Sequence, residues 1–394
     1  MTETHEKTLT QDAPAVGRPR QGISRIWSAL SGFAGLTGVV LLMFVPSVHP
    51  RVTRLDHWTA DWRTAYLSPR ADTQNAQVAV VTITDETLRN VVSSPVDRGL
   101  LADIVAAIDA AGAKAIGLDI LFLKPTDASK DARLVEVLKT ARVTVILGAL
   151  DERGDLLPFQ RAFQTEFLAK TGRVSGYVNL RHETDGVVRF TASPAPGSAT
   201  PKSFARLMAE AADPNAVDDA ATPIPWMQSA RDGKPALLAL PAEMLLGAAG
   251  PDEAKLAAGV LKDRIVFVGG NFPFRDQHRV PLSVRTGQSI PGLMIQATIT
   301  AGLLAPQYQI AEISPIMVRL LLAATALSGM AMGYALRRQA SVASLEQGFA
   351  VVVLLALDAI CFTQLRILLP FTLAVTAWVA GLASGRFFGA ELRP

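Results

Sequence analysis

The sequence contains a single cysteine, Cys361, and this residue lies inside an apolar run. One cysteine cannot form an intramolecular disulfide, so the fold does not depend on a disulfide framework. It also cannot supply a metal site built from several cysteines. We therefore expect Cys361 to act as a small apolar residue that faces lipid or a neighbouring helix.

An excess of charge of one sign and catalytic motifs are also missing. The chain has 38 Lys and Arg against 35 Asp and Glu, a net charge of +3 with no dense basic stripe, so nucleic-acid binding is not expected. The motifs G-x-S-x-G, G-x-x-x-x-G-K-[ST] and H-E-x-x-H are absent, and the five histidines are scattered. We expect no enzyme activity, no catalytic residue, no cofactor and no metal.

Long apolar runs are present instead. Hydrophobic residues make up 49% of the chain and the mean hydropathy is +0.28, which suits a protein that is part membrane-embedded and part globular. Four runs are long enough to cross a hydrocarbon core of about 30 Å at about 1.5 Å per residue. We predict transmembrane helices at 23–47, 314–336, 347–368 and 370–386, a disordered leader at 1–22 and a short tail at 387–394.

The arginines beside these runs predict their orientation. Arg18 and Arg20 precede the first predicted span and Arg25 lies at its start, and Arg337 and Arg338 follow the second. Since cytoplasmic flanks are enriched in Lys and Arg, both termini are predicted to be cytoplasmic, and residues 51–309 to lie outside a bacterial inner membrane. A cleavable signal peptide is the alternative for the first run, but its exit lacks a small-x-small cleavage pattern. Asp358, near the middle of the third span, is expected to face a partner helix or a cavity.

Residues 51–309 have the composition of a globular domain. Short Val- and Ile-rich runs predict buried strands at 77–83, 114–122 and 143–150, with helices between them. This β-α-β-α-β start favours an α/β fold with a largely parallel or mixed sheet covered by helices. Later strands are predicted at 175–180, 187–193 and 264–270, and later helices at 203–212 and 291–304. For the Pro- and Asp-rich stretch 213–241 the sequence predicts no definite secondary structure.

Six segments of this domain resemble, in order, one sensor family. They are VAVVTITDETL, PVDRGLLADIV, AKAIGLDILF, YVNLRHETDGVVRF, LKDRIVFVGG and IPGLMIQATITAGLL. With one span before the domain and three after it, they resemble the CHASE domain, type 2, an extracytoplasmic sensory domain of bacterial adenylate cyclases, histidine kinases and Ser/Thr kinases. The resemblance implies a sensor of a small ligand or an envelope component.

Members of that family usually continue into a cytoplasmic catalytic domain, for which residues 386–394 are too few. The resemblance therefore implies a membrane-anchored sensor that relays through its helices to a separate membrane or cytoplasmic output protein. The alternative is a non-signalling structural or assembly subunit that binds an envelope protein through the outer domain. The sequence does not decide whether the chain forms a homodimer. The lipid bilayer is a further expected partner.

Polar residues occur at the strand ends of the predicted sheet, where α/β proteins bind ligands. Asp85 follows the first strand, Arg98 opens the first helix, Asp119 ends the second strand, and Asp276 and His278 follow the last. One interpretation is a small-ligand or cation pocket in which Asp85 and Asp119 supply carboxylates and Arg98 binds an anion. The other is a structural network of capping carboxylates and one paired arginine.

Other positions in the resembling segments are expected to have structural roles: Asp185, Gly186, Arg189, Gly269, Pro291 and Gly292. Asp185 and Gly186 form a turn signal between two predicted strands. Asp276 and His278 alone are too few ligands for a metal site.

Overall fold

The computed structural model describes residues 49–89, 95–215, 222–248, 250–336 and 343–391. The chain divides into two compact units, one made of residues 53–315 and 353–371 and the other of the remainder. The predicted leader 1–22, the predicted span 23–47 and the end of the predicted tail lie outside the described residues.

The larger unit alternates strands and helices. Its strands are β1 (Val78–Ile83), β2 (Ala115–Asp119), β3 (Thr144–Ala149), β4 (Val174–Tyr177), β5 (Arg181–His182), β6 (Val188–Phe190), β7 (Leu238–Pro241), β8 (Ile265–Gly270), β9 (Gln277–His278), β10 (Ile290–Pro291), β11 (Ala311–Glu312) and β12 (Ile367–Leu368). Its helices are α2 (His49–Leu67), α3 (Arg98–Ala110), α4 (Ala128–Thr140), α5 (Pro158–Thr171), α6 (Phe204–Ala212), α7 (Ala242–Leu245), α8 (Pro251–Leu261), α9 (Ser283–Thr286), α10 (Gly292–Leu303) and the short turn η1 (Pro306–Tyr308).

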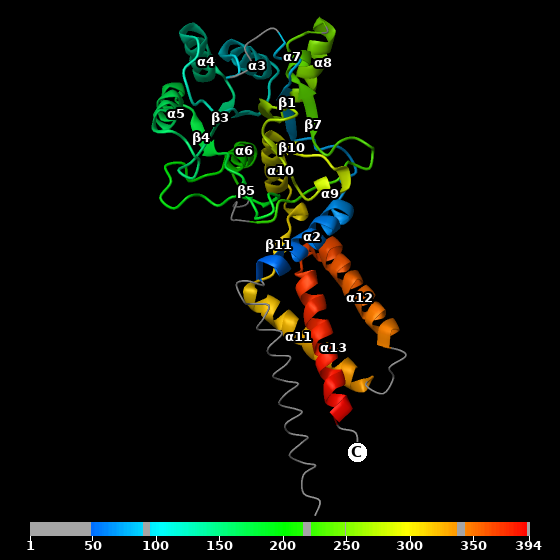
Figure 1. Ribbon diagram of the computed structural model, residues 1–394. Helices are drawn as coiled ribbons and strands as arrows, with labels where there is room; N and C mark the ends of the chain where they lie inside the picture. The colour runs from blue at the N-terminus through cyan, green and yellow to red at the C-terminus, as the bar shows by residue number, and fades with distance from the viewer. Residues whose placement is uncertain (1–48, 90–94, 216–221, 249, 337–342, 392–394) are drawn as a thin grey trace, which may run out of the picture. The chain divides into compact units, whose positions relative to one another are not determined.

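Six strands form one sheet in the order β4-β3-β2-β8-β1-β7. Figure 1 shows β4 and β3 toward one end of this sheet and β1 and β7 toward the other. Every pairing within it is parallel, with Val80 beside Phe267 and Ile116 beside Val266. The predicted β-α-β-α-β start is confirmed as β1-α3-β2-α4-β3. The short pair β5 and β6 is antiparallel and lies outside this sheet. Strand β6 falls within the predicted strand 187–193, whereas β5 was not predicted.

Helices cover both faces of the sheet. Alternate strand residues, such as Val81, pack on one side against α3, α4, α5, α7 and α8, and the intervening residues, such as Val80, pack on the other against α6 and α10. The Asp97 side chain caps α3 by accepting from the backbone N–H of Leu100. Both hydrophobic faces of the sheet are thereby buried, as parallel sheets require.

Strand β8 divides the connections of the sheet. After β1 and β2, the two neighbours of β8, the chain continues on the face covered by α3 and α4. After β8 it continues on the opposite face, which is covered by α10. Connections that diverge to opposite faces leave a crevice outside the carboxyl ends of the strands, where open α/β sheets bind ligands. The sheet therefore has such a crevice beside β8.

Helix α2 presents two different faces. Trp58, Trp62 and Tyr66, four residues apart, are exposed, and the rings of Trp62 and Tyr66 are stacked with centroids 5.4 Å apart. We call these three residues the aromatic row. Asp61 and Arg63 are buried on the same helix. An exposed Trp and Tyr surface of this kind is typical of helices at a membrane–water interface.

The remaining helices are α11 (Pro315–Ala335), α12 (Ala343–Ile360), the π-helical turn η2 (Cys361–Leu365) and α13 (Phe371–Glu391). Within the described part of the chain, α11 is the one helix long and apolar enough to cross a membrane. Helices α12 and α13 occupy the third and fourth predicted spans, but their described residues do not meet the same test. The prediction of four transmembrane helices is therefore not confirmed.

Helices α11 and α13 approach each other through glycines on both sides. A Cβ atom added at Gly329 or Gly333 would lie 2.2 Å from a carbonyl oxygen of α13, and one added at Gly381 or Gly385 would lie 2.0 Å from a carbonyl oxygen of α11. The two helices thus contact through their backbones. Small residues four apart allow this close approach in pairs of membrane helices.

Candidate functional site

A pocket of about 610 Å³ lies at the carboxyl edge of the sheet, beside β8. Residues at or just after the ends of β2, β3, β4 and β8 line it, together with the first residues of α3 and α10. This volume lies within the range of small-molecule sites, about 300–1,000 Å³. The pocket therefore coincides with the crevice that the strand order creates.

Four of the five predicted ligand-binding residues line this pocket: Arg98, Asp119, Asp276 and His278. The fifth, Asp85, is exposed and is not part of the lining. Strand β1 ends at Ile83, and the next residues form a turn in which the Thr87 hydroxyl donates to Glu243. That turn carries Asp85 away from the pocket.

Arg98 is buried, with 1% of its surface exposed. Its guanidinium lies over the Phe122 ring, 4.5 Å from the centroid, and its Nε is 3.5 Å from an oxygen of Asp131. Among the described residues, none of its three nitrogens has a hydrogen-bond partner. Burial lowers the pKa of Arg98, and its attraction to Asp131 opposes that shift. The sequence suggested an anion-binding arginine or a paired one, and the contact with Asp131 is too long to satisfy the guanidinium.

Asp119 is the last residue of β2 and faces the pocket. Burial, and next the negative charge of Asp276, raises the pKa of Asp119 to about 7. No hydrogen bond joins its carboxyl group to any described side chain or backbone group. The Asp119 backbone and Cβ also crowd Gly269, where an added Cβ would lie 3.1 Å from the Asp119 carbonyl oxygen.

Asp276 has an unusual backbone conformation, with φ +53°. This left-handed region is rare for residues other than Gly, Asn and Asp, and it is enriched at functional sites. The Asp276 carboxylate lies against Gly292, where an added Cβ would be 2.8 Å from it. Gly292 begins α10, whose positive N-terminal end favours a negative charge at this place. The close approach explains why a glycine stands at 292.

A histidine pair lies at the same pocket. His182 Nε2 is 3.0 Å from His278 Nδ1, and His278 Nε2 is 2.9 Å from Asp276 Oδ1. Burial, and next the neighbouring His278, lowers the pKa of His182. His182 was not predicted, because the two histidines are 96 positions apart in the sequence and meet where a parallel bridge joins Val187, beside β6, to Arg279, beside β9.

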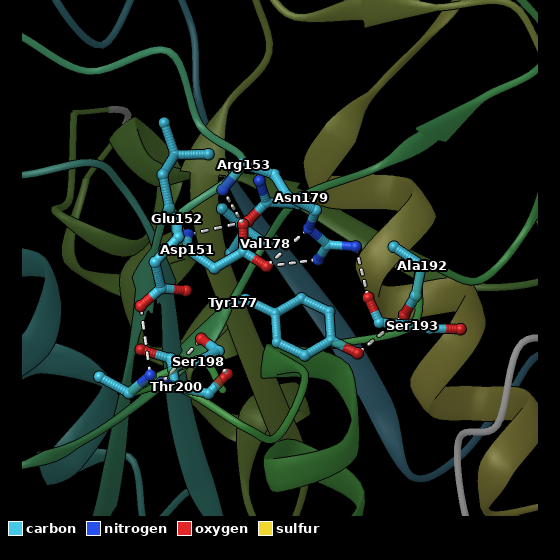
Figure 2. Close-up of polar contacts among 12 residues, drawn as sticks. Asp151, Glu152, Arg153, Tyr177, Val178, Asn179, Ala192, Ser193, Ser198 and Thr200 are labelled. Carbon is cyan, nitrogen blue, oxygen red and sulfur yellow. Dashed lines mark hydrogen bonds and ion pairs between the residues drawn. The ribbon is translucent and has the colours of Figure 1, made fainter. Parts of the chain in front are cut away.

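A second polar cluster adjoins the pocket at Asn179 (Figure 2). The Asn179 side chain accepts from the backbone N–H of Asp151, and Arg153 pairs with the buried Asp151 carboxylate. The Tyr177 hydroxyl donates to the backbone oxygen of Ala192, 2.7 Å away. Since each of these groups is satisfied within the cluster, its role is to hold the ends of β3 and β4 together.

The described residues contain no group of three or more His, Cys, Asp or Glu side chains able to hold a metal ion. Charged residues of both signs occur in the lining of the pocket: Arg98 and Arg275, and Asp119 with Asp276. Such an arrangement can bind and orient a small polar molecule.

A comparison with models of protein families matches residues 36–332 to the CHASE2 domain. The chain belongs to the CHASE2 family. CHASE2 domains are extracytoplasmic sensory domains, so the resemblance of the six segments is confirmed. No curated protein and no solved structure shows a significant match.

In this CHASE2 domain, Arg189 of β6 forms a buried ion-pair network. Its guanidinium donates to both oxygens of Asp61, at 2.7 and 2.6 Å, and to both oxygens of Asp185, at 2.9 and 2.7 Å. Gly186, with φ +78°, completes the turn that places Asp185. Structural roles were predicted from the sequence for Asp185 and Arg189 but not for Asp61, which lies far from them in the chain, on α2.

A second buried pair links α2 of the CHASE2 unit to α12. Arg63 pairs with Asp358, and its guanidinium also donates to the Leu369 backbone oxygen at 3.3 and 3.4 Å. Asp358 was predicted near the middle of a span, but the regular helix ends at Ile360, so Asp358 lies in its last turn. Its partner is α2 and not one of the predicted membrane helices.

Proposed function

We propose that this CHASE2 protein is a membrane-anchored sensor. Its outer domain binds a small ligand in the pocket beside β8 and relays the change through α2 and the membrane helices to a separate output protein in the membrane or cytoplasm. The proposed arrangement is multi-pass in a bacterial inner membrane, with both termini cytoplasmic. The family match and the pocket support the sensory part of this proposal.

The observation that carries the relay is a series of contacts running from the pocket to α12. His182 lines the pocket, and its strand β5 pairs with β6, which carries Arg189. Arg189 binds Asp61 on α2, and two residues further along that helix Arg63 binds Asp358. A shift of β6 therefore acts on α2 and on the 353–371 segment. The ligand drives it only by binding one arrangement more tightly than the other.

The relay is tested by replacing Arg63 and, as a control, a second arginine of α2. Full-length chain is captured from native membranes, and the activity of the co-purified output protein is measured with wild type, Arg63→Gln and Arg54→Gln. Arg54 is an exposed arginine of the same helix and serves as the matched control. We expect a co-purified kinase, cyclase or regulator whose response is lost in Arg63→Gln and kept in Arg54→Gln. Recovery of envelope proteins alone would favour an assembly subunit and refute the sensor.

The proposed topology has its own test. Reporter fusions placed after Arg338 and at Pro394 are both expected to report the cytoplasm, because arginines flank these positions. An external signal at Pro394 would contradict the arrangement of four spans.

A further inference from the structure

The pocket beside β8 contains a carboxyl group that lacks a partner. Asp119 ends β2 and lines the pocket, and its carboxyl group has no hydrogen bond to any described residue. Burial, and next the charge of Asp276, raises the pKa of Asp119 to about 7. Polar groups removed from bulk water nearly always have a partner in the protein, in ordered water or in a ligand. The Asp119 carboxyl group is therefore the natural contact point for an occupant of the pocket.

Asp276 supplies a second carboxylate to the same pocket. Its Oδ1 is 2.9 Å from His278 Nε2, and the side chain remains 60% exposed. The carboxylate approaches the first residue of α10 through Oδ2, which would be 2.8 Å from a Cβ added at Gly292. Because the two negative charges repel each other, a positively charged occupant would favour the ionised form of both.

The arginines of the lining do not neutralise these carboxylates. Arg98 is buried against the Phe122 ring, and its nearest carboxylate is that of Asp131, 3.5 Å from its Nε. Arg275 is exposed and forms no ion pair with any described residue. The acidic pair is thus available to a cation from outside the protein.

An ammonium group is the cation that suits this pair. A metal ion would need further ligands, and the described part of the chain has no group of three or more His, Cys, Asp or Glu side chains that could hold one. An ammonium group has three donors, enough for the Asp119 carboxyl group and an oxygen of Asp276. Hydrogen bonds between such charged groups are about twice as strong as those between neutral groups.

The rest of the lining suits an apolar group attached to the ammonium. Val96, Leu121, Leu180 and Phe272 contribute apolar side chains. The volume of about 610 Å³ is in the range of organic ligands and far exceeds what one ammonium group fills. A hydrated inorganic cation would leave this apolar surface unused.

We propose that the pocket binds a small organic amine, with its ammonium group on Asp119 and Asp276 and its apolar part on the hydrophobic lining. This assignment rests on the proposed sensor function and gives the chemical class of its ligand.

The test measures binding to the full-length chain in lipid nanodiscs at pH 8. Primary amines from propylamine to phenethylamine are titrated one by one by calorimetry, with empty nanodiscs as the reference for partition into lipid. The best amine is compared with its N-acetyl derivative and with the alcohol of the same skeleton. Each neutral analogue is expected to bind at least about tenfold more weakly, because it loses the charge-assisted contacts. The assignment is overturned if no amine binds, or if either neutral analogue binds as tightly as the amine.

Variants locate the binding. Asp119→Asn and Asp276→Asn are each expected to weaken the best amine at least about tenfold. The matched control Asp85→Asn removes an exposed carboxylate that follows the same sheet outside the pocket, and it is expected to stay within about twofold of wild type. Equal losses in Asp119→Asn and Asp85→Asn would refute the location. The analogue series uses the wild-type chain, so it remains decisive if a variant does not fold.

The pH dependence of binding is an independent check. An amine keeps its charge below about pH 9, whereas Asp119, with a pKa of about 7, ionises between about pH 6 and 8. Binding to wild type should therefore weaken about tenfold from pH 8 to pH 6. The charged and titratable groups that share the lining with Asp119 are Arg98, Arg275, Asp276, His182 and His278.

Histidines titrate in the same range, so Asp119→Asn separates the two contributions. Its residual binding should change less than about threefold between pH 8 and pH 6, because the group that must ionise is gone. An equal pH dependence in wild type and in Asp119→Asn would refute the contact between the amine and Asp119.

The assignment and the sensor function fail separately. Amine binding without any change in a captured output protein keeps the ligand class and refutes the relay. An output protein that responds to a different chemical class, with no amine binding, keeps the sensor and refutes the ligand class.

Discussion

The ion-pair network around Arg189 yields a quantitative prediction. Arg189 and Asp61 are each 6% exposed and share two hydrogen bonds. Replacing Arg189 with Met leaves the Asp61 carboxylate buried without its cation, and removing one partner of a buried pair costs about 3–5 kcal/mol. Asp61→Asn leaves Arg189 still bound to Asp185, so we expect a smaller cost of about 1–3 kcal/mol.

Thermal unfolding of the full-length chain measures this difference. For a domain of this size, each kcal/mol lowers the melting temperature by about 2–4 °C, so Arg189→Met should lower it by roughly 6–20 °C. The buried Trp226 provides a fluorescence signal within the domain. The control is Arg89→Met, whose exposed pair with Glu86 contributes about 0–1 kcal/mol.

The pH dependence has a definite sign. Hydrogen bonds from Arg189 lower the pKa of Asp185 from 3.8 to about 2, so the folded state holds this proton less readily than the unfolded state. The resulting stability is present at neutral pH and is lost as the pH falls from about 4 toward 2.

The prediction for Arg189 is refuted if the melting temperature of Arg189→Met lies within about 2 °C of that of Arg89→Met.

Three further outcomes are expected. Because the pKa of Asp119 is raised to about 7, the folded wild-type chain should lose stability as the pH rises from about 4 to 7. Asp119→Asn should remove this loss and stabilise the chain by about 1–2 kcal/mol near pH 8. Melting curves recorded at several pH values check both outcomes. Gly381→Ile should force α13 away from α11 and cost about 1–3 kcal/mol in detergent unfolding, whereas Gly348→Ile, with open space around it, should not. Brominated lipids should quench wild-type fluorescence more than that of Trp62→Phe, since the aromatic row is expected at the membrane interface.

Local signals predicted the first part of the sheet well. Buried parallel strands are continuous apolar runs, so β1, β2 and β3 could be placed from composition alone. Helices α5, α7 and α8 and strand β7 were not predicted. The periodicity of α5 is weak, and β7 lies within residues 213–241, which are rich in Pro and Asp.

The candidate site was predicted only in part, because its geometry depends on pairings distant in the chain. Residues at strand ends could be expected to share one edge, and the pocket brings Arg98, Asp119 and Asp276 together. Asp85 failed this expectation because its turn leads away from the edge. Asp61 stands on a helix outside the sheet, where no local pattern shows that it faces Arg189.

The central position of β8 has a consequence for how the chain folds. This strand is the last of the sheet to be synthesised, yet it lies between β1 and β2, which are among the first. Until it arrives, β1 and β2 have unpaired edges, and contacts between distant parts of a chain form slowly. Nearly the whole domain must therefore emerge before its sheet can close. A chain truncated before Ile265 would keep the apolar strands but expose two open edges prone to aggregation.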